Sequence, residues 1–139
     1  MARRTVVRMI VVDSNVWIFA EDASSDRHGI AAAALKRTVE SDEIGLTPII
    51  VSEVFHSLSR IAGPGVARQR VMDILEDPSC AWLSLTAQTA KAAMILAEKS
   101  SVKINDALIA QQAIEIKASV LTDNVKDFRK VRGLKVIPL

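Results

Sequence analysis

The sequence predicts a single domain with a parallel, layered α/β fold, and three observations lead to this prediction. The chain has 139 residues, which is enough for one hydrophobic core but short for two ordinary domains. Half of its residues are hydrophobic, which excludes a disordered chain. Short β-branched segments alternate with longer segments of helical spacing, the order typical of strands that pair in parallel with helices packed on the sheet.

Short segments with the composition of buried strands recur along the chain. Residues 6–12 are β-branched or apolar at nearly every position, as expected for a strand that is covered on both faces of a sheet. Four shorter segments of the same kind follow, at residues 44–46, 81–85, 119–122 and 135–137. Helical segments separate them, so we expect the strands to run parallel.

Apolar spacing and capping residues predict the helices between these strands. We expect helices that end near residues 20, 39, 60, 75, 99 and 117, with a break at residues 63–65 and a short helical piece between the last two strands. Ser14 or Asn15 is expected to cap the first helix, and Asn105 the last of the long ones. Thr47 followed by Pro48 provides an N-cap and a first-turn proline for the third.

Charge is distributed unevenly although the formal net charge is only +2, which does not by itself indicate a nucleic-acid partner. Basic residues crowd both ends of the chain: Arg3, Arg4 and Arg8 at the start, and Lys126, Arg129, Lys130, Arg132 and Lys135 at the end. If the two ends lie close together, these side chains form a basic rim able to hold phosphates. Ordinary solvated surface charge explains each of them singly.

Cysteine content and hydropathy bear on the cellular compartment. Cys80 is the only cysteine, so no intrachain disulfide is possible and a reducing compartment fits. Lys and Glu interrupt every apolar run before it reaches transmembrane length. Asp13 and Asn15 cut the apolar run near the start, which argues against a signal peptide. We therefore expect a cytoplasmic protein.

Acidic residues stand at points where α/β sheets place their chemistry. Asp13 follows the first strand, Glu53 lies among apolar residues of the third helix, and Asp106 lies in the first turn of a later helix. Converging carboxylates repel one another and raise their pKa values unless a cation neutralises them. Separated Asp and Glu without a suitable His or Cys partner favour Mg²⁺ or Mn²⁺ over zinc. The pattern therefore predicts oxygen ligands for a hard divalent cation.

A fourth group of polar residues follows the strand at 119–122. Thr122 ends this strand, so its hydroxyl is expected to face the same site as Asp13. Three residues then compete for the fourth position at the site, and at least one of them serves a turn or a cap: Asp123, Asn124 and Asp127.

Structural explanations compete with the functional ones. Asp13 and Asp106 each stand at a helix start, where a carboxylate stabilises the helix dipole without any catalytic role. Glu53 is also explained as an ordinary helix-surface glutamate. Ser14 and Asn15 either hydrogen-bond to Asp13 or only cap the helix that follows.

Four segments in this order resemble the PIN domain family, and within it the VapC toxin ribonucleases of bacterial VapBC toxin–antitoxin pairs. The segments are Val-Asp-Ser-Asn-Val-Trp-Ile at 12–18, Ser-Glu-Val-Phe-His at 52–56, Ile-Asn-Asp-Ala-Leu-Ile-Ala at 104–110 and Leu-Thr-Asp-Asn-Val-Lys-Asp-Phe at 121–128. Their order and spacing together are specific, and the resemblance covers essentially the whole chain.

The resemblance implies a single PIN-like domain over residues 1–139, with a central parallel sheet of four or five strands flanked by helices in an α/β/α sandwich. It implies an endoribonuclease that depends on Mg²⁺ or Mn²⁺ and acts as the toxin of a type II system, cleaving RNA to inhibit translation and growth. It also implies a homodimer, and a small VapB-like antitoxin that covers helices near the site.

The resemblance also assigns roles to individual residues. It places Asp13, Glu53 and Asp106 as metal ligands and catalytic residues, and it adds Asn124 and Asp127 as the fourth catalytic position. Asparagine rather than aspartate at 124 argues against a second tightly held metal. Residues expected to support the site or bind substrate are Ser14, Asn15, Thr122 and Asp123.

Two alternatives remain open. The first keeps the fold but makes the protein a non-toxin PIN nuclease that acts in RNA processing. The second is a metal-independent binding or scaffold module, in which the acidic residues are only caps and surface charges.

Overall fold

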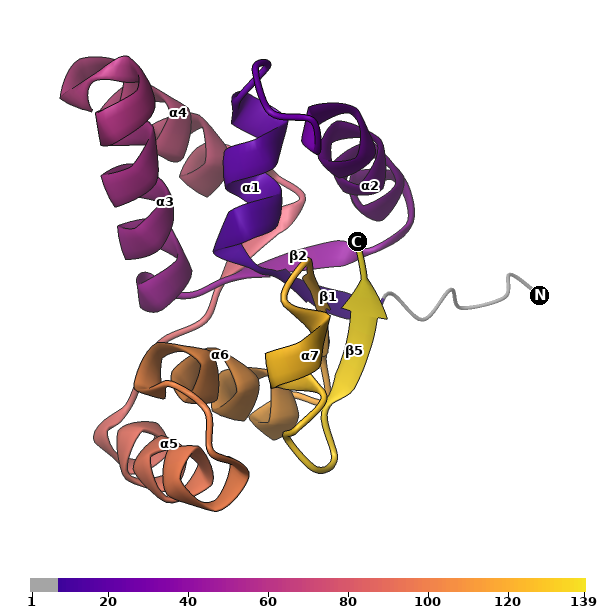
Figure 1. Ribbon diagram of the computed structural model, residues 1–139, viewed down its shortest axis with the longest axis vertical. Coiled ribbons are helices and arrows are strands. Elements are labelled where there is room, and N and C mark those ends of the chain that lie inside the picture. The colour runs from indigo at the N-terminus through magenta and orange to yellow at the C-terminus, as the bar shows by residue number, and fades with distance from the viewer. Residues whose placement is uncertain (1–7) are drawn as a thin grey trace.

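Five short strands form one fully parallel sheet in the order β3-β2-β1-β4-β5 (Figure 1). The computed structural model describes residues 8–139. The strands are β1 Met9–Val12, β2 Glu43–Leu46, β3 Cys80–Trp82, β4 Ser119–Thr122 and β5 Lys135–Pro138. The predicted parallel α/β fold is confirmed, while Arg3, Arg4 and the predicted strand residues 6 and 7 lie outside the described residues.

Helices cover both faces of this sheet, which confirms the predicted α/β/α sandwich. They are α1 Ser14–Glu21, α2 His28–Ser41, α3 Pro48–Ala62, α4 Pro64–Glu76, α5 Ala87–Ser100, α6 Ile104–Glu115 and α7 Val125–Phe128. Helices α1 to α4 lie on one side of the sheet and α5 to α7 on the other (Figure 1). Crossovers between parallel strands are right-handed, so a connection changes face when the direction along the sheet reverses at β3.

The core lies on the two central strands. Residues 10–12 of β1 and Val120 and Leu121 of β4 are all buried, as the unbroken apolar runs predict for strands with helices on both faces. The edge strand β3 is shorter than the predicted 81–85, and its Trp82 is exposed. Leu83 continues the pairing by only one further hydrogen bond, from its N–H to the carbonyl of Leu46.

Three predicted helix starts differ from the structure. Asp13, not Ser14 or Asn15, is the N-cap of α1, because its carboxylate accepts a hydrogen bond from the Ser14 N–H. Helix α6 begins at Ile104 without a side-chain cap, so Asn105 lies inside its first turn. The break near residue 63 is a single residue, Gly63 at φ +90°, after which α4 begins at Pro64. No helix in the described part of the chain combines the length and the apolarity that crossing a membrane requires.

The two central strands also create a crevice. The connection after β1 runs over one face of the sheet and the connection after β4 over the other, so the helices that follow diverge. Open α/β sheets bind ligands at such a switch point, outside the carboxyl ends of the strands. Asp13 follows β1 at this point, its N–H donates to the Leu121 carbonyl of β4, and Thr122 ends β4 beside it.

Candidate active site

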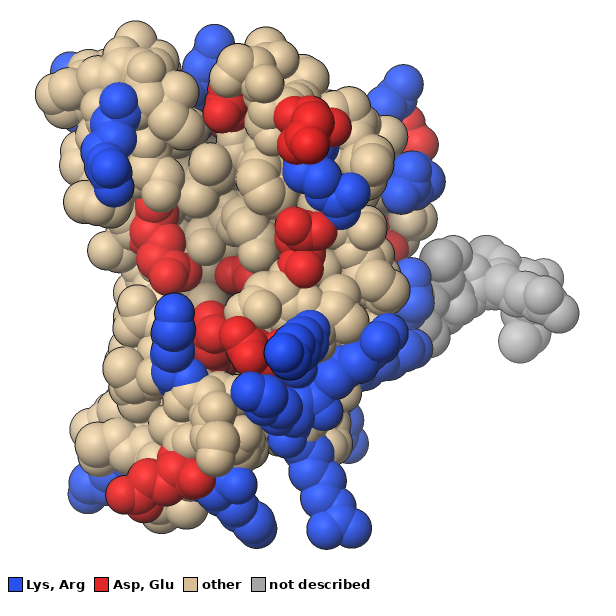
Figure 2. All heavy atoms as spheres, in the orientation of Figure 1, with Lys and Arg blue, Asp and Glu red and all other residues tan. Residues whose placement is uncertain are grey.

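A cleft of about 530 Å³ opens at this switch point. It is lined by Asp13, Ser14, Asn15, Glu53, Lys103, Ile104, Asn105, Asp106 and Asn124. Figure 2 shows acidic side chains gathered in the hollow on this face of the molecule. The cleft therefore brings together the three predicted acidic residues, which come from the end of β1, from α3 and from α6.

Asp13 is the most buried of these acids, with only 4% of its surface exposed. Its carboxylate accepts hydrogen bonds from the Thr122 hydroxyl at 2.7 Å, from the Ser14 N–H at 2.8 Å and from the Asn15 side-chain amide at 3.2 Å. Burial raises the pKa of Asp13 although the hydrogen bonds from Thr122 and Ser14 oppose the shift, and the nearby Glu53 carboxylate raises it further. The Thr122 hydroxyl thus faces the same site as Asp13, as predicted.

Glu53 reaches the cleft from the middle of α3. Thr47 caps this helix by accepting a hydrogen bond from the Ile50 N–H, and the buried Val54 fixes which face of α3 meets the core. Glu53, half-buried on the adjoining face, accepts a hydrogen bond of 3.1 Å from the Ser14 hydroxyl. Ser14 therefore contacts both carboxylates, Asp13 through its backbone and Glu53 through its side chain.

Asp106 stands across the cleft in the first turn of α6. Burial raises the pKa of its half-buried carboxyl, and repulsion from Asp13 and Asp127 adds to this effect. The Asn124 side-chain amide donates a long hydrogen bond of 3.4 Å to Asp106. Lys103, one turn earlier, opposes the rise in the pKa of Asp106.

The three candidates after β4 point to different partners. Asn124 lines the cleft, and its N–H donates to the Thr122 hydroxyl at 2.9 Å. Asp123 instead forms an ion pair of 2.7 Å with Arg27, while its N–H donates to the Asn15 side chain. Asp127 pairs with Lys130 at 3.2 Å; the hydrogen bonds from Lys130 and Asn124 hold its pKa below the ordinary value. Of the three, the structure places Asn124 in the cleft.

The cleft suits a hard cation better than a soft one. Within residues 8–139, no three His, Cys, Asp or Glu side chains lie close enough to form a metal site by themselves. Mg²⁺ commonly takes only one or two protein carboxylates and keeps several waters. The acidic residues that line the cleft can provide only oxygen atoms as ligands. Asp13 and Asp106 repel each other, and a bound cation would neutralise their negative charges. These residues fit Mg²⁺ or Mn²⁺ completed by water.

Sequence reasoning missed several residues around the cleft. Lys103, Ile104 and Asn105 all line it, and their position directly before Asp106 was the available signal. The residue type at position 105 predicts only a helix cap. Arg27, which holds Asp123, gave no signal because it lies 96 residues away in the sequence.

Comparison with known proteins identifies the family. The PIN domain family matches residues 10–134, and the chain belongs to this family. No curated protein sequence matches the chain.

Solved structures with the same fold include components of toxin–antitoxin complexes. VapBC2 from Rickettsia felis, bound to a promoter DNA fragment, has a TM-score of 0.73 at 19% identity, covering 94% of this chain and 98% of that one. DNA-bound VapBC from Salmonella typhimurium also has a TM-score of 0.73, at 15% identity, covering 96% and 98%. VapC20 from Mycobacterium tuberculosis, a toxin that cleaves the sarcin–ricin loop, has a TM-score of 0.73 at 15% identity, covering 84% and 92%. These similarities establish a shared fold.

Proposed function

We propose that this protein is a metal-dependent endoribonuclease and the toxin of a type II, VapBC-like toxin–antitoxin system, which cleaves RNA to inhibit translation and growth. The observation that carries the proposal is the convergence of Asp13, Glu53 and Asp106, from three distant segments, in one cleft. Membership of the PIN domain family and the shared fold with VapC structures support it. We also propose that the PIN domain, which matches residues 10–134, extends over residues 1–139 as one domain.

Asp13 and Asp106 are the residues we propose as direct ligands of Mg²⁺ or Mn²⁺, with Glu53 as a further ligand. Such a cation, when bound, supplies Lewis-acid chemistry: it lowers the pKa of a water molecule and stabilises negative charge on phosphate oxygens. Thr122, Ser14 and Asn15 hold the Asp13 carboxylate through hydrogen bonds. Because a water molecule is the nucleophile, no side chain needs to form a covalent intermediate.

The residues near Asp106 have supporting roles in this proposal. Asn124 orients the Asp106 carboxylate by donating to it, and Asp127 adds negative charge beside it. Asp13, Glu53 and Asp106 form an acidic floor of the cleft, which repels phosphate unless a cation is present, so cleavage is expected to require the metal. Asp123 supports the site through its backbone contact with Asn15.

Alanine substitution tests the assignment of the metal ligands. Asp13→Ala and Asp106→Ala are each expected to reduce RNA cleavage in Mg²⁺ or Mn²⁺ to background, because each removes a ligand. Circular dichroism and thermal unfolding establish that each variant is folded, and Glu98→Ala, an exposed acid on α5, is the matched control. Wild-type cleavage by either variant would refute the assignment.

We propose two protein partners, a VapB-like antitoxin and a second copy of this chain. We also propose that the protein acts in the cytoplasm. Several neighbours in fold were solved as VapBC complexes, which supports the first partner. Two apolar residues of α3, Val54 and Leu58, are buried in the core and are therefore not available to contact a protein partner. Ile61 is 51% exposed and lines a groove with Ile18 between α3 and α1, which we propose receives the antitoxin.

Growth measurements test the toxin assignment separately from the chemistry. Expression of this chain alone in bacteria is expected to arrest growth, because uncontrolled RNA cleavage stops translation. Co-expression of a small protein encoded beside it is expected to relieve the arrest. Normal growth on expression of an active nuclease would instead favour the non-toxin PIN nuclease.

A further inference from the structure

A cationic surface lies beside the acidic cleft, around α7. Its residues are Lys126, Arg129 and Lys130, extended by Arg132 and Lys135, and we call it the α7 basic surface. Residues 126–135 hold five Lys or Arg and one acid, whereas the rest of the chain holds thirteen Lys or Arg and fifteen acids. Figure 2 shows basic side chains gathered next to the acidic hollow. The small net charge therefore conceals a strong local separation of charge.

The local structure presents these cations to solvent. Phe128 and Val131 are buried and anchor the segment to the core, while Lys126, Arg129 and Lys130 are exposed at a spacing of three and four residues. Lys130 is paired with Asp127. Lys126 and Arg129 form no ion pair within the part of the chain that the structure describes. At least two cations are thus free to bind an anion.

The α7 basic surface is continuous with the cleft. Asn124, which lines the cleft, is the residue directly before α7, and Asp127 of α7 lies close enough to Asp106 to raise its pKa. Lys103 is the single cation among the residues that line the cleft. Its charge acts on both Asp106 and Asp127, so Lys103 lies near both acids, on the α6 side of the cleft.

We infer that a nucleic-acid strand crosses the cleft with its flanking phosphates held by the α7 basic surface and by Lys103. The acidic floor contributes repulsion to a phosphodiester chain, so affinity must come from cations outside the floor. An acidic protein partner fits less well, because the centre of a protein interface is largely apolar and the apolar residues of this segment already pack inward. Phe128 and Val131 are buried, and Leu134 packs against the core. That the bound strand is the substrate rests on the proposed function.

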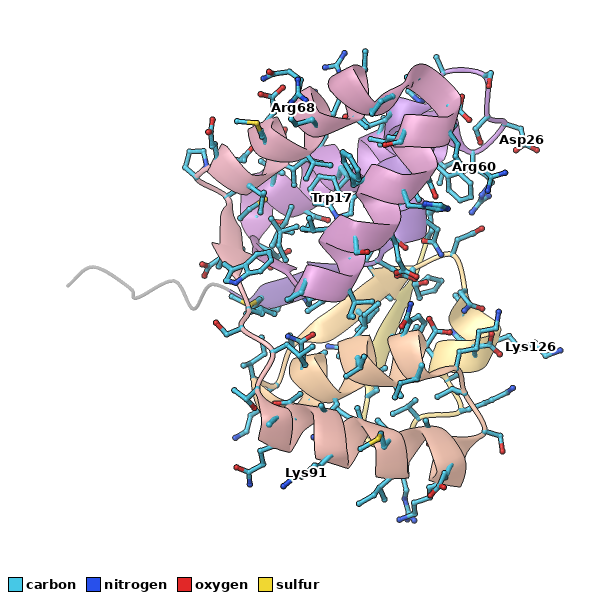
Figure 3. The ribbon with its side chains drawn as sticks, turned by 90° about the vertical axis from the view of Figure 1, so that its left-hand side faces the viewer. Trp17, Asp26, Arg60, Arg68, Lys91 and Lys126 are labelled. Carbon is cyan, nitrogen blue, oxygen red and sulfur yellow. The ribbon has the colours of Figure 1, made fainter. Side chains whose placement is uncertain are left out.

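Binding without cleavage tests the inference. A fluorescein-labelled single-stranded RNA of mixed sequence, and DNA of the same sequence, are titrated in EDTA with the full chain at several salt concentrations. The test variant is Lys126→Gln/Arg129→Gln. The control is Lys91→Gln/Lys99→Gln, which removes the same charge from exposed lysines of α5; Figure 3 shows Lys91 well away from Lys126.

The test variant is expected to bind at least tenfold more weakly than wild type at low salt. Its slope of log affinity against log salt is expected to decrease by about 1.4, because each contact to a single-strand phosphate contributes about 0.7. The control is expected to keep the wild-type slope. Lys103→Gln is expected to weaken binding as well, since it removes the cation on the α6 side of the cleft.

Each other outcome overturns the inference. These outcomes are no measurable binding by wild type, an unchanged slope in the test variant, or an equal loss in the control. A test variant that loses binding to a polyglutamate peptide while keeping oligonucleotide binding would assign the surface to an acidic protein. The RNA and DNA arms show whether the sugar matters or only the shared phosphodiester backbone.

The same preparations separate this inference from the proposed function. A chain that binds RNA through Lys126 and Arg129 but cleaves none in Mg²⁺ or Mn²⁺ refutes the nuclease and leaves the binding surface standing. A chain that cleaves RNA but binds it equally well without these cations refutes the surface alone.

Discussion

At the scale of single residues, Asp13 stands out because burial of its carboxylate opposes folding. Its carboxylate is almost completely buried, and burial raises its pKa in spite of three hydrogen-bond donors. A buried charge costs free energy unless it is compensated. The donors compensate part of this cost, and a bound cation would compensate more.

The raised pKa values predict how cation binding depends on pH. A protonated carboxyl cannot ligate a cation, so the affinity for Mn²⁺ is expected to fall as the pH decreases through the pKa values of Asp13 and Asp106. Because both values are raised, this loss begins at a higher pH than for ordinary aspartates. Calorimetric titration with Mn²⁺ across this pH range measures it. An affinity that is constant down to the ordinary aspartate range would contradict the prediction.

At the scale of elements, the loop between β4 and α7 is held from three directions. Thr122 donates to Asp13, Asp123 pairs with Arg27 from the segment between α1 and α2, and Asn124 donates to Asp106. Arg27 also lies 3.5 Å from the carbonyl oxygen of Leu139. The position of Asn124 in the cleft therefore depends on an ion pair that lies outside the cleft.

Loss of this ion pair is expected to slow cleavage without unfolding the protein. Arg27→Ala and Asp123→Ala should each reduce kcat more than they change KM, because the loop that orients Asp106 is loosened while phosphate contacts remain. The two effects should not add, since residues in direct contact usually show coupling of about 0.5–3 kcal/mol. Steady-state cleavage by the single and double variants measures this coupling. Purely additive effects would show that the pair does not act as a unit.

The element scale also shows where sequence reasoning succeeded. Thr47 and Pro48 were predicted to open α3, and the Thr47 side chain accepts a hydrogen bond from the Ile50 N–H. Such a cap involves residues close in sequence, so the local sequence alone reveals it. Asn105 shows the opposite case. Its type suits a cap, but α6 begins at Ile104, two residues before the predicted start, and the Asn105 side chain lines the cleft.

At the scale of the whole molecule, the site depends on the order of the strands. β1 and β4 are separated by more than a hundred residues in sequence but pair directly, with Val12 beside Leu121. Their connections leave on opposite faces, which opens the cleft between them. Every acid of the cleft therefore depends on the complete sheet, and partial folding would not assemble it.

A cation that binds only the folded molecule must stabilise it. Addition of Mg²⁺ or Mn²⁺ is expected to raise the Tm of the wild type, by an amount that grows with the logarithm of concentration above Kd. Asp13→Ala is expected to show no such rise, because it lacks a central ligand. Thermal unfolding followed by circular dichroism measures both. No rise in the wild type would favour the metal-independent binding module, and an equal rise in wild type and variant would place the cation away from Asp13.

The sequence alone was sufficient for the parallel α/β fold and for placing Asp13, Glu53 and Asp106 near one edge of the sheet. Strand composition, helical spacing and caps are local properties, and parallel strands bring their carboxyl ends to the same edge. Only the tertiary structure decided which of Asp123, Asn124 and Asp127 faces the cleft, and that Lys103 joins it. Side-chain direction in a short loop depends on partners such as Arg27, whose distance in sequence is unrelated to its distance in space.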